Sequence, residues 1–359
     1  MDLGFFRELL SIDSTSGKER KVAEWLAERL PGMFPAANRP ALRAEEVGDG
    51  TLNLLLTWGT PRIVFCSHLD TVPPYIEPTF PEGVFLSEPS LRDTVIKGRG
   101  SCDAKGQIFA IVEACKKLAE EGKTDFGMLL LAGEETGSWG AKAFAKTDFS
   151  AEYLVVGEPT DNCMVSASKG TKSFDLKFTG EPFHSGYPQY GVSAVDLFVA
   201  FVNALKAKDF GIDPDLGETT WNIGLVHSDN PQNILSPELT CRIYFRTTFV
   251  SDDAVQQWMA DAPALIPGLT SSVIPGLTGN LAVTARGGDT PARYWTVDGL
   301  PSKSAAFGSD APHLKNFTHK AICGPGSITV AHRDDEHVTV ADLATAVNQY
   351  LALYRSVME

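Results

Sequence analysis

The chain has 359 residues, with 45 acidic and 31 basic side chains and a formal net charge of −14. It contains no Lys/Arg run of the kind that follows a phosphate backbone, which argues against nucleic acid or an anionic membrane as a partner. The length exceeds one ordinary hydrophobic core and predicts two domains, each able to bury a stable interior.

The N-terminal segment and the cysteines indicate a reducing compartment. Met1–Gly4 lacks the basic and apolar parts of a secretory signal, and no apolar run reaches the roughly 18 residues that span a bilayer. We therefore expect a cytoplasmic protein. Its cysteines, at positions 66, 102, 115, 163, 241 and 323, form no CxxC pair and are expected to be reduced packing residues. A thiolate metal ligand at Cys66 or Cys102 is the alternative.

The first half of the chain alternates predicted helices and strands. Ser16–Glu19 fits a capping box before a helix that should run to Pro31. Strand-like runs are at 53–58, 62–69, 127–133 and 153–158, and a helical apolar period covers 105–121. Near-continuously apolar strands between helices predict an α/β fold with a mixed, largely parallel sheet and flanking helices. Ligands in such sheets bind at the carboxyl ends of strands.

The pattern changes after residue 164 to the β-α-β-β-α-β order of a ferredoxin-like α+β domain. Its predicted strands are 171–180, 221–227, 239–249 and 271–274, and its helices are 192–206 and 252–261. Strand-like runs return at 304–307 and 321–323, and a helix runs from 340 to 357. We expect a domain of residues 164–278 inserted into a catalytic domain of residues 1–163 and 279–359. The Gly-, Thr- and Pro-rich segment 279–303 is expected to be a loop.

A histidine and a carboxylate follow the second strand-like run. His68 and Asp70 are spaced i, i+2 and point to the same side of a strand, where Asp70 could fix His68 for metal binding. Alone, such a pair is more often a structural hydrogen bond. Further carboxylates and a histidine in strand-end contexts favour a two-metal hydrolase: Asp103, Glu134, Glu135, Glu158 and His332.

Glu134 and Glu135 end a very apolar strand. Two like charges at a buried strand end repel each other, so the pair would be costly without a cation or a raised pKa. A metal resolves this cost, because one Glu can ligate it while the other stays free as a general base.

The other candidates have structural alternatives. Asp103 could be a helix N-cap, and Glu158 a solvated loop acid. The glycines of 98–106 resemble a dinucleotide loop, but Asp103 stands where a third glycine is needed and no strong strand precedes it. Either His332 or His337 could be the histidine ligand. The chain has neither HExxH nor GxSxG, which argues against a helical zincin site and a nucleophile-elbow hydrolase.

Six motifs carry a family resemblance across nearly the whole chain. In order they are FCSHLDTVP, GRGSCDAKG, AGEETGSWGA, VGEPT, FHSGYPQYG and GPGSITVAH. In order and spacing they resemble the dinuclear zinc family of acetylornithine deacetylase, succinyl-diaminopimelate desuccinylase, aminoacylase-1 and bacterial glutamate carboxypeptidase. The resemblance implies a zinc exopeptidase-like fold, and the overall appearance is most similar to acetylornithine and acetylcitrulline deacetylases of arginine biosynthesis.

The resemblance also implies roles for single residues. Asp103 would bridge two Zn²⁺ ions, with Co²⁺ as a possible substitute. His68 and Glu158 would complete one site, and Glu135 and His332 the other. Asp70 would orient His68 from behind. Glu134 would be the general base that takes a proton from a metal-activated water. A cis peptide is expected between Asp103 and Ala104.

Three residues of the inserted domain match family positions that serve the substrate. His184 matches an oxyanion donor that reaches the site of a neighbouring subunit, so the resemblance implies a homodimer formed by the inserted domain. Asn233 and Arg246 match positions that bind the substrate α-carboxylate, with Arg242 as an alternative clamp. Gly308–Asp310 resembles a segment that lines the pocket.

The substrate expected from this resemblance is a small N-acyl amino acid or a short peptide. A Glu at position 158 goes with deacylases and carboxypeptidases in this family, whereas aminopeptidases and many dipeptidases carry Asp. We therefore expect a deacetylase of the acetylornithine or acetylcitrulline type. The closest alternative is a metallo-carboxypeptidase or dipeptidase with the same site. A non-catalytic metal-binding interaction protein is disfavoured, because the base and all ligand positions are present.

Overall fold

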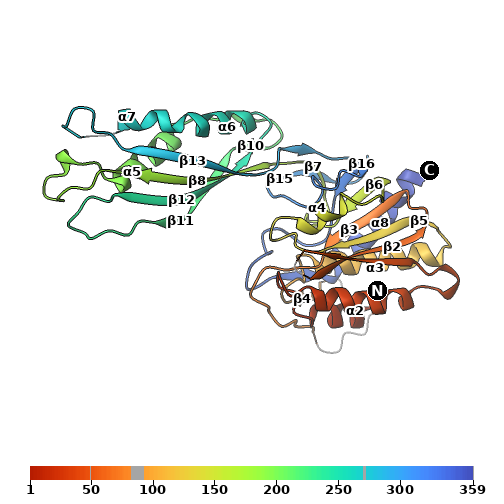
Figure 1. The fold of residues 1–359 in the computed structure, drawn as a ribbon. Helices are drawn as coiled ribbons and strands as arrows, with labels where there is room; N and C mark the ends of the chain where they lie inside the picture. The colour runs from red at the N-terminus through yellow and green to blue at the C-terminus, as the bar shows by residue number, and fades with distance from the viewer. Residues whose placement is uncertain (49, 82–92, 270–271, 359) are drawn as a thin grey trace. The chain divides into compact units, whose positions relative to one another are not determined.

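The computed structural model describes residues 1–48, 50–81, 93–269 and 272–358. These residues divide into two compact units, each described by itself below (Figure 1). Unit 1 comprises Met1–Ser166, Tyr294–Lys303 and Ser309–Glu359, and unit 2 comprises Ala167–Arg293 and Ser304–Gly308. Unit 2 is thus inserted in the sequence of unit 1, and it extends to residue 293 rather than ending at 278.

Unit 1 is built on a six-stranded mixed sheet. Its order is β1-β2-β5-β3-β6-β16, formed by Ala41–Val47, Thr51–Gly59, Asp125–Leu131, Ile63–His68, Ala151–Val156 and Phe317–Ile322. Strands β5, β3, β6 and β16 run parallel, whereas β2 is antiparallel to β5 and β1 is antiparallel to β2. The expected α/β fold with a mixed, largely parallel sheet is confirmed.

Helices bury one face of this sheet. The large apolar core joins alternate strand residues such as Ile63 and Phe65 to helices α1, α2, α3 and α8, formed by Leu3–Leu10, Arg20–Arg29, Lys105–Glu120 and Val340–Met358. Because successive strand residues alternate, His68 lies with Val64 and Cys66 on the opposite face of β3. Helix α4 (Trp139–Phe144) packs against β2. The shorter strands β4 (Val95–Lys97) and β17 (His337–Thr339) pair with each other.

The start of α2 differs from the predicted capping box. No side chain caps this helix, and the Glu19 carboxylate instead accepts the N–H of Gly17 at 2.6 Å. The Ser16 hydroxyl donates to the Asp70 carboxylate at 3.0 Å. The local motif fits a capping box, but the Ser16 hydroxyl donates to the distant Asp70 carboxylate instead of capping the helix.

Unit 2 is an α+β sandwich. Its antiparallel sheet has the order β11-β12-β8-β13, formed by Thr220–His227, Glu238–Thr247, Gly170–Thr179 and Asn280–Gly287. Helices α5 (Ala194–Ala207), α6 (Asp252–Asp261) and α7 (Ile266–Leu269) contribute to the apolar core on one face. Together with the chain order β8-α5-β11-β12-α6-β13, this is the expected ferredoxin-like arrangement.

The last strand of unit 2 lies later than predicted. Ser271 is outside the described residues, and 272–274 form no strand, so the strand predicted at 271–274 is wrong. Strand β13 takes its place, and β14 (Ala292–Arg293) follows, so the expected loop 279–303 contains strands. Leu281 is buried against β8, and this single burial in a Gly- and Thr-rich segment is a weak sequence signal.

The remaining short strands are β7 (Met164–Ser168), β9 (Ile212–Asp213), β10 (Gly217–Glu218) and β15 (Ser302–Ala305). Within the described ranges, no helix has the length and apolar character needed to cross a bilayer.

Candidate metal centre

The carboxyl ends of the parallel strands bring the first candidates together. Register aligns His68 with Leu131 of β5, and Cys66 with Val156 of β6. The Gly157 N–H then donates to the Cys66 carbonyl at 2.7 Å, which carries Glu158 past the end of β6 beside β3. Parallel pairing therefore gathers side chains that are distant in the sequence at one edge of the sheet.

Asp103 lies between two histidines. Its Oδ1 is 3.1 Å from Nε2 of His68, and its Oδ2 is 3.3 Å from Nε2 of His332. The same His332 nitrogen is 3.0 Å from Oε1 of Glu135. The N-cap interpretation of Asp103 is wrong, because the cap of α3 is Ala104 and no side chain caps the helix. The Asp103–Ala104 peptide is cis, as predicted.

The hydrogen-bond roles of His68 suit a metal ligand. Nδ1 is 2.9 Å from the backbone carbonyl of Asp70, which can only accept, so Nδ1 carries the proton of the neutral ring. Nε2 then presents a lone pair to a carboxylate oxygen of Asp103. Two acceptors this close need a proton or a metal ion between them.

The acidic neighbours of His68 and His332 also favour proton binding by these two histidines. Burial opposes charging of His68, but the hydrogen bonds with Asp103 and Asp70 outweigh it and raise its pKa well above the usual value. The hydrogen bonds of His332 with Asp103 and Glu135 raise its pKa to about 10. A bound cation would take the place of these protons.

The donor set fits a pair of divalent cations. Ligand atoms of His68, Asp103 and Glu135 lie within 4.8 Å of one another. Glu158 is 4% exposed, and its buried Oε1 has no hydrogen-bond partner among the described residues. Imidazole nitrogens and carboxylate oxygens at one buried place, including an orphaned oxygen, are the ligands that zinc takes in hydrolytic sites.

Two alternatives for the donor set receive no support from the geometry. Nδ1 of His337 is 2.8 Å from the Asp335 carbonyl, and His337 begins β17, so of the two histidines His332 is the one that contacts the cluster. Among the described residues, neither Cys66 nor Cys102 belongs to the group of potential ligand atoms, and burial raises the pKa of both thiols well above the usual value. All six cysteines are free.

Asp70 supports the cluster differently than expected. Its backbone carbonyl is the nearer partner of His68, whereas its carboxylate is 3.5 Å from Nδ1. The carboxylate accepts the backbone N–H groups of Glu134 at 3.0 Å and Glu135 at 3.1 Å. Asp70 therefore orients both His68 and the paired glutamates.

Glu134 is a carboxylate with a raised pKa beside the cluster. Burial raises the pKa of its carboxyl well above the usual value, and the negative charges of Asp310 and Glu135 add to this increase. Asp310 is itself 1% exposed, and burial raises its pKa to about 7. A carboxylate with a raised pKa beside the cluster suits a general base.

The residues predicted in the inserted domain all lie in unit 2. His184 and Asn233 are exposed, and their loops are joined by the Ser185 N–H, which donates to the Asn233 carbonyl at 2.9 Å. Arg246 is near the far end of β12, roughly 26 Å along the strand from Glu238. Unit 2 therefore brings His184 and Asn233 together but keeps Arg246 apart from them.

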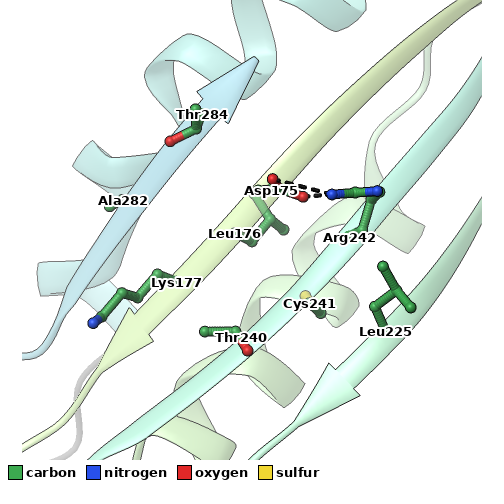
Figure 2. A pocket seen from close by; sticks show the side chains of 9 residues that line it. All are labelled: Asp175, Leu176, Lys177, Leu225, Thr240, Cys241, Arg242, Ala282 and Thr284. Atoms are coloured by element: carbon green, nitrogen blue, oxygen red, sulfur yellow. Dashed lines mark hydrogen bonds and ion pairs between the residues drawn. The ribbon is translucent and has the colours of Figure 1, made fainter. Parts of the chain in front are cut away.

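The two arginines of β12 differ in their partners. Figure 2 shows Arg242 directed at Asp175 in a pocket on the sheet, with Nε 2.7 Å from Oδ1 and a second contact at 3.3 Å. Arg246 lies over the ring of Tyr244 at 5.0 Å. Among the described residues, no carboxylate is within ion-pair distance of Arg246. Arg246 is thus the better placed of the two to receive a substrate carboxylate.

Glu336 is the residue that sequence reasoning missed. It ends the acidic run 334–336, but it is 1% exposed and its Oε1 accepts the N–H groups of Gly100, Cys102 and Asp103. Buried Arg99 pairs with its other oxygen at 2.6 Å.

Comparisons with known proteins agree with this fold. The family model described as peptidase family M20/M25/M40 matches residues 64–356. A probable carboxypeptidase of Emericella nidulans is 33% identical, over 99% of this chain and 89% of that protein.

Two solved structures show the same fold at low sequence identity. A tripeptidase of Staphylococcus aureus has a TM-score of 0.77 at 19% identity, covering 97% of this chain and 95% of that one. A family M20 metallo-carboxypeptidase of Sulfolobus solfataricus has a TM-score of 0.68 at 16% identity, covering 98% of both chains. From the family match and the identity to its relative, the chain belongs to peptidase family M20/M25/M40 and is a hydrolytic metallo-exopeptidase.

Proposed function

We propose that the chain is a metallo-carboxypeptidase that hydrolyses the peptide bond next to a free α-carboxylate in a short peptide. The observation that carries its metal chemistry is the position of Asp103, whose two oxygens each face Nε2 of a histidine. A relative described as a probable carboxypeptidase along 99% of this chain favours this specificity over the deacetylase expected from the motifs.

We assign the metal ligands as the sequence predicted. His68, Asp103 and Glu158 would hold one Zn²⁺ ion, and Asp103, Glu135 and His332 would hold the other. The distances around Asp103 and the orphaned oxygen of Glu158 support this set. When bound, two such cations lower the pKa of a shared water and polarise the scissile carbonyl.

The remaining chemistry belongs to the chain. Glu134 takes the proton of the attacking water and returns it to the leaving amine, a task that its raised pKa favours. Asp70 holds Glu134 in place through the backbone N–H of that residue. The low exposure of Asp103 and Glu158 limits competition from bulk water for the ligand atoms.

The residues of unit 2 are proposed to recognise the substrate. Arg246 binds the α-carboxylate, supported by its freedom from an acidic partner among the described residues. His184 donates to the oxyanion, and Asn233 assists the carboxylate. Because Arg246 lies at the opposite end of β12 from these two, one chain does not offer all three to a short substrate. This separation supports the predicted homodimer, in which a neighbouring subunit supplies His184 and Asn233.

An N-acyl amino acid deacylase is the second candidate. The six motifs favour it, Glu158 fits either activity, and its substrates carry the same α-carboxylate. The two activities differ in what lies on the carbonyl side of the scissile amide bond: a peptide residue for the carboxypeptidase and a small acyl group for the deacylase.

A substrate panel on the Zn²⁺-reconstituted protein tests the proposal. It contains a dipeptide, the same dipeptide N-blocked, its C-terminal amide, and the N-acetyl derivative of its C-terminal residue. The carboxypeptidase hydrolyses the N-blocked peptide and fails on the amide. Preference for the N-acetyl amino acid would replace the proposal with the deacylase, and a strict requirement for a free amine would replace it with a dipeptidase or aminopeptidase.

A further inference from the structure

The buried pair Arg99–Glu336 joins the loops that carry the candidate ligands. Both side chains are 1% exposed, and Nη1 of Arg99 is 2.6 Å from Oε2 of Glu336. A buried charge pair is costly unless its remaining hydrogen-bonding groups are satisfied. Here they are satisfied by backbone groups of three separate segments.

The Glu336 carboxylate occupies a nest of backbone donors. Its Oε1 accepts the N–H of Gly100 at 2.9 Å, and those of Cys102 and Asp103 at 3.0 Å each. One of these donors belongs to Asp103 itself. The carboxylate therefore fixes the backbone from which the bridging side chain projects toward His68 and His332.

Arg99 extends the connection to two other loops. Its Nε donates to the carbonyl of Pro74 at 3.1 Å, in the segment that follows His68 and Asp70. Its Nη1 donates to the carbonyl of Arg333 at 3.2 Å, the residue next to His332. One guanidinium thus ties together the segments after His68 and beside His332, while its own residue lies in the Asp103 loop.

We propose that Glu336, with Arg99, is a positioning residue that sets the separation of Asp103 from His332 and thereby the affinity of the metal centre. The side chains touch neither substrate nor metal, and they act through the backbone of the ligand-bearing loops. His332 has a φ of +64°, a conformation that a non-glycine residue holds only when its surroundings fix it. The inference rests on the proposed metal centre.

The test substitutes Glu336→Gln and compares it with Asp335→Asn. Gln keeps the size of Glu but turns an amide N–H₂ either toward the Arg99 cation or toward the three backbone donors. Asp335 is the neighbouring acid, with its side chain 60% exposed and paired with Arg333, so it is a matched surface control. Each metal-free protein is titrated with Co²⁺, recording the visible spectrum, and then with Zn²⁺ in competition with a chelator.

For Glu336→Gln we expect roughly 10- to 100-fold weaker binding at one or both sites and an altered Co²⁺ spectrum. Asp335→Asn should match the unsubstituted protein. A role confined to stability would lower the Tm of Glu336→Gln and leave the Kd and spectrum of its folded form unchanged, and that result would overturn the inference.

A second variant keeps the test decisive if Glu336→Gln does not fold. Arg99→Lys leaves the Glu336 nest intact but removes the planar fork that reaches Pro74 and Arg333. Weaker metal binding by this variant is expected, and unchanged binding would contradict the inference. If the unsubstituted protein itself bound no metal, the proposed metal centre would be wrong. If the unsubstituted and substituted proteins bound metal equally well, only the positioning role of Glu336 and Arg99 would be wrong.

Discussion

The two units present their candidate residues in opposite ways. In unit 1, His68, Asp103 and Glu158 are buried and in contact with one another or with neighbouring loops. In unit 2, His184 and Asn233 are exposed on loops, and Arg246 lies far along β12 from both. Metal chemistry needs pre-organised ligands in a protected place, whereas substrate recognition needs groups that stay open to an incoming molecule. On this contrast we propose that unit 1 carries the chemistry and unit 2 the recognition of the substrate.

The largest expected effect on turnover distinguishes the general base of unit 1 from its metal ligands. Glu134→Gln should reduce kcat by roughly 10²- to 10⁴-fold, the usual range for a lost general base, while both metal ions stay bound. Steady-state kinetics and elemental analysis of the same preparation measure both quantities. Near-normal turnover would remove Glu134 from the mechanism, and lost metal would make it a ligand.

The next effect asks whether unit 2 serves a neighbouring chain. His184→Ala should cost roughly 10²- to 10³-fold in kcat, as for a lost oxyanion donor. Mixing His184→Ala subunits with Glu134→Gln subunits should restore activity, because a heterodimer contains one site with both groups intact. No recovery despite proven subunit exchange would mean that His184 acts within its own chain or has no catalytic role.

Recognition of the α-carboxylate should distinguish the two arginines of β12. Arg246→Met should lower kcat/KM by roughly 10- to 100-fold, mainly through KM, because a charged hydrogen-bond partner of the substrate is lost. Arg242→Met is the matched control, since Asp175 already engages its guanidinium. Equal losses in the two variants, or a larger loss for Arg242→Met, would reverse the assignment.

The smallest effect concerns protons at the metal centre. Neighbouring Asp103 and Glu135 raise the pKa of His332 from 6.5 to about 10, so the contribution of its proton to folding stability is full below pH 6.5 and is lost as the pH rises through about 10. Metal requires the deprotonated ring, so binding should release protons and strengthen by up to about tenfold per pH unit for each proton released. Calorimetry at pH 7 in buffers of different ionisation enthalpy measures the number of protons released on metal binding. No proton release would contradict the prediction.

The sequence predicted more of the structure of unit 1 than of unit 2. In unit 1, apolar strands with polar residues at their ends predicted both the sheet and the gathering of His68, Glu135 and Glu158, since parallel strands end at one edge. The choice of His332 over His337 came from resemblance, and the distances agree with it. In unit 2, β13 was missed because one buried residue, Leu281, barely marks it.

The long-range polar contacts that support the site could not be predicted from the sequence. Nothing in the run 334–336 distinguishes buried Glu336 from its exposed neighbours, because its partners are backbone N–H groups more than 200 residues away in sequence. Ser16 likewise fits a local cap, yet it donates to Asp70. Long-range polar contacts of this kind leave no periodic pattern in a sequence.

The claim on which the comparison depends is that the strand ends of unit 1 and the His332 loop hold two cations. Metal content per chain, measured after Zn²⁺ reconstitution and removal of free ion, tests it most directly for three proteins. We predict two ions for the unsubstituted protein, one for His332→Ala and two for His337→Ala. Two ions in His332→Ala with one in His337→Ala, or no retained metal in the unsubstituted protein, would contradict the claim.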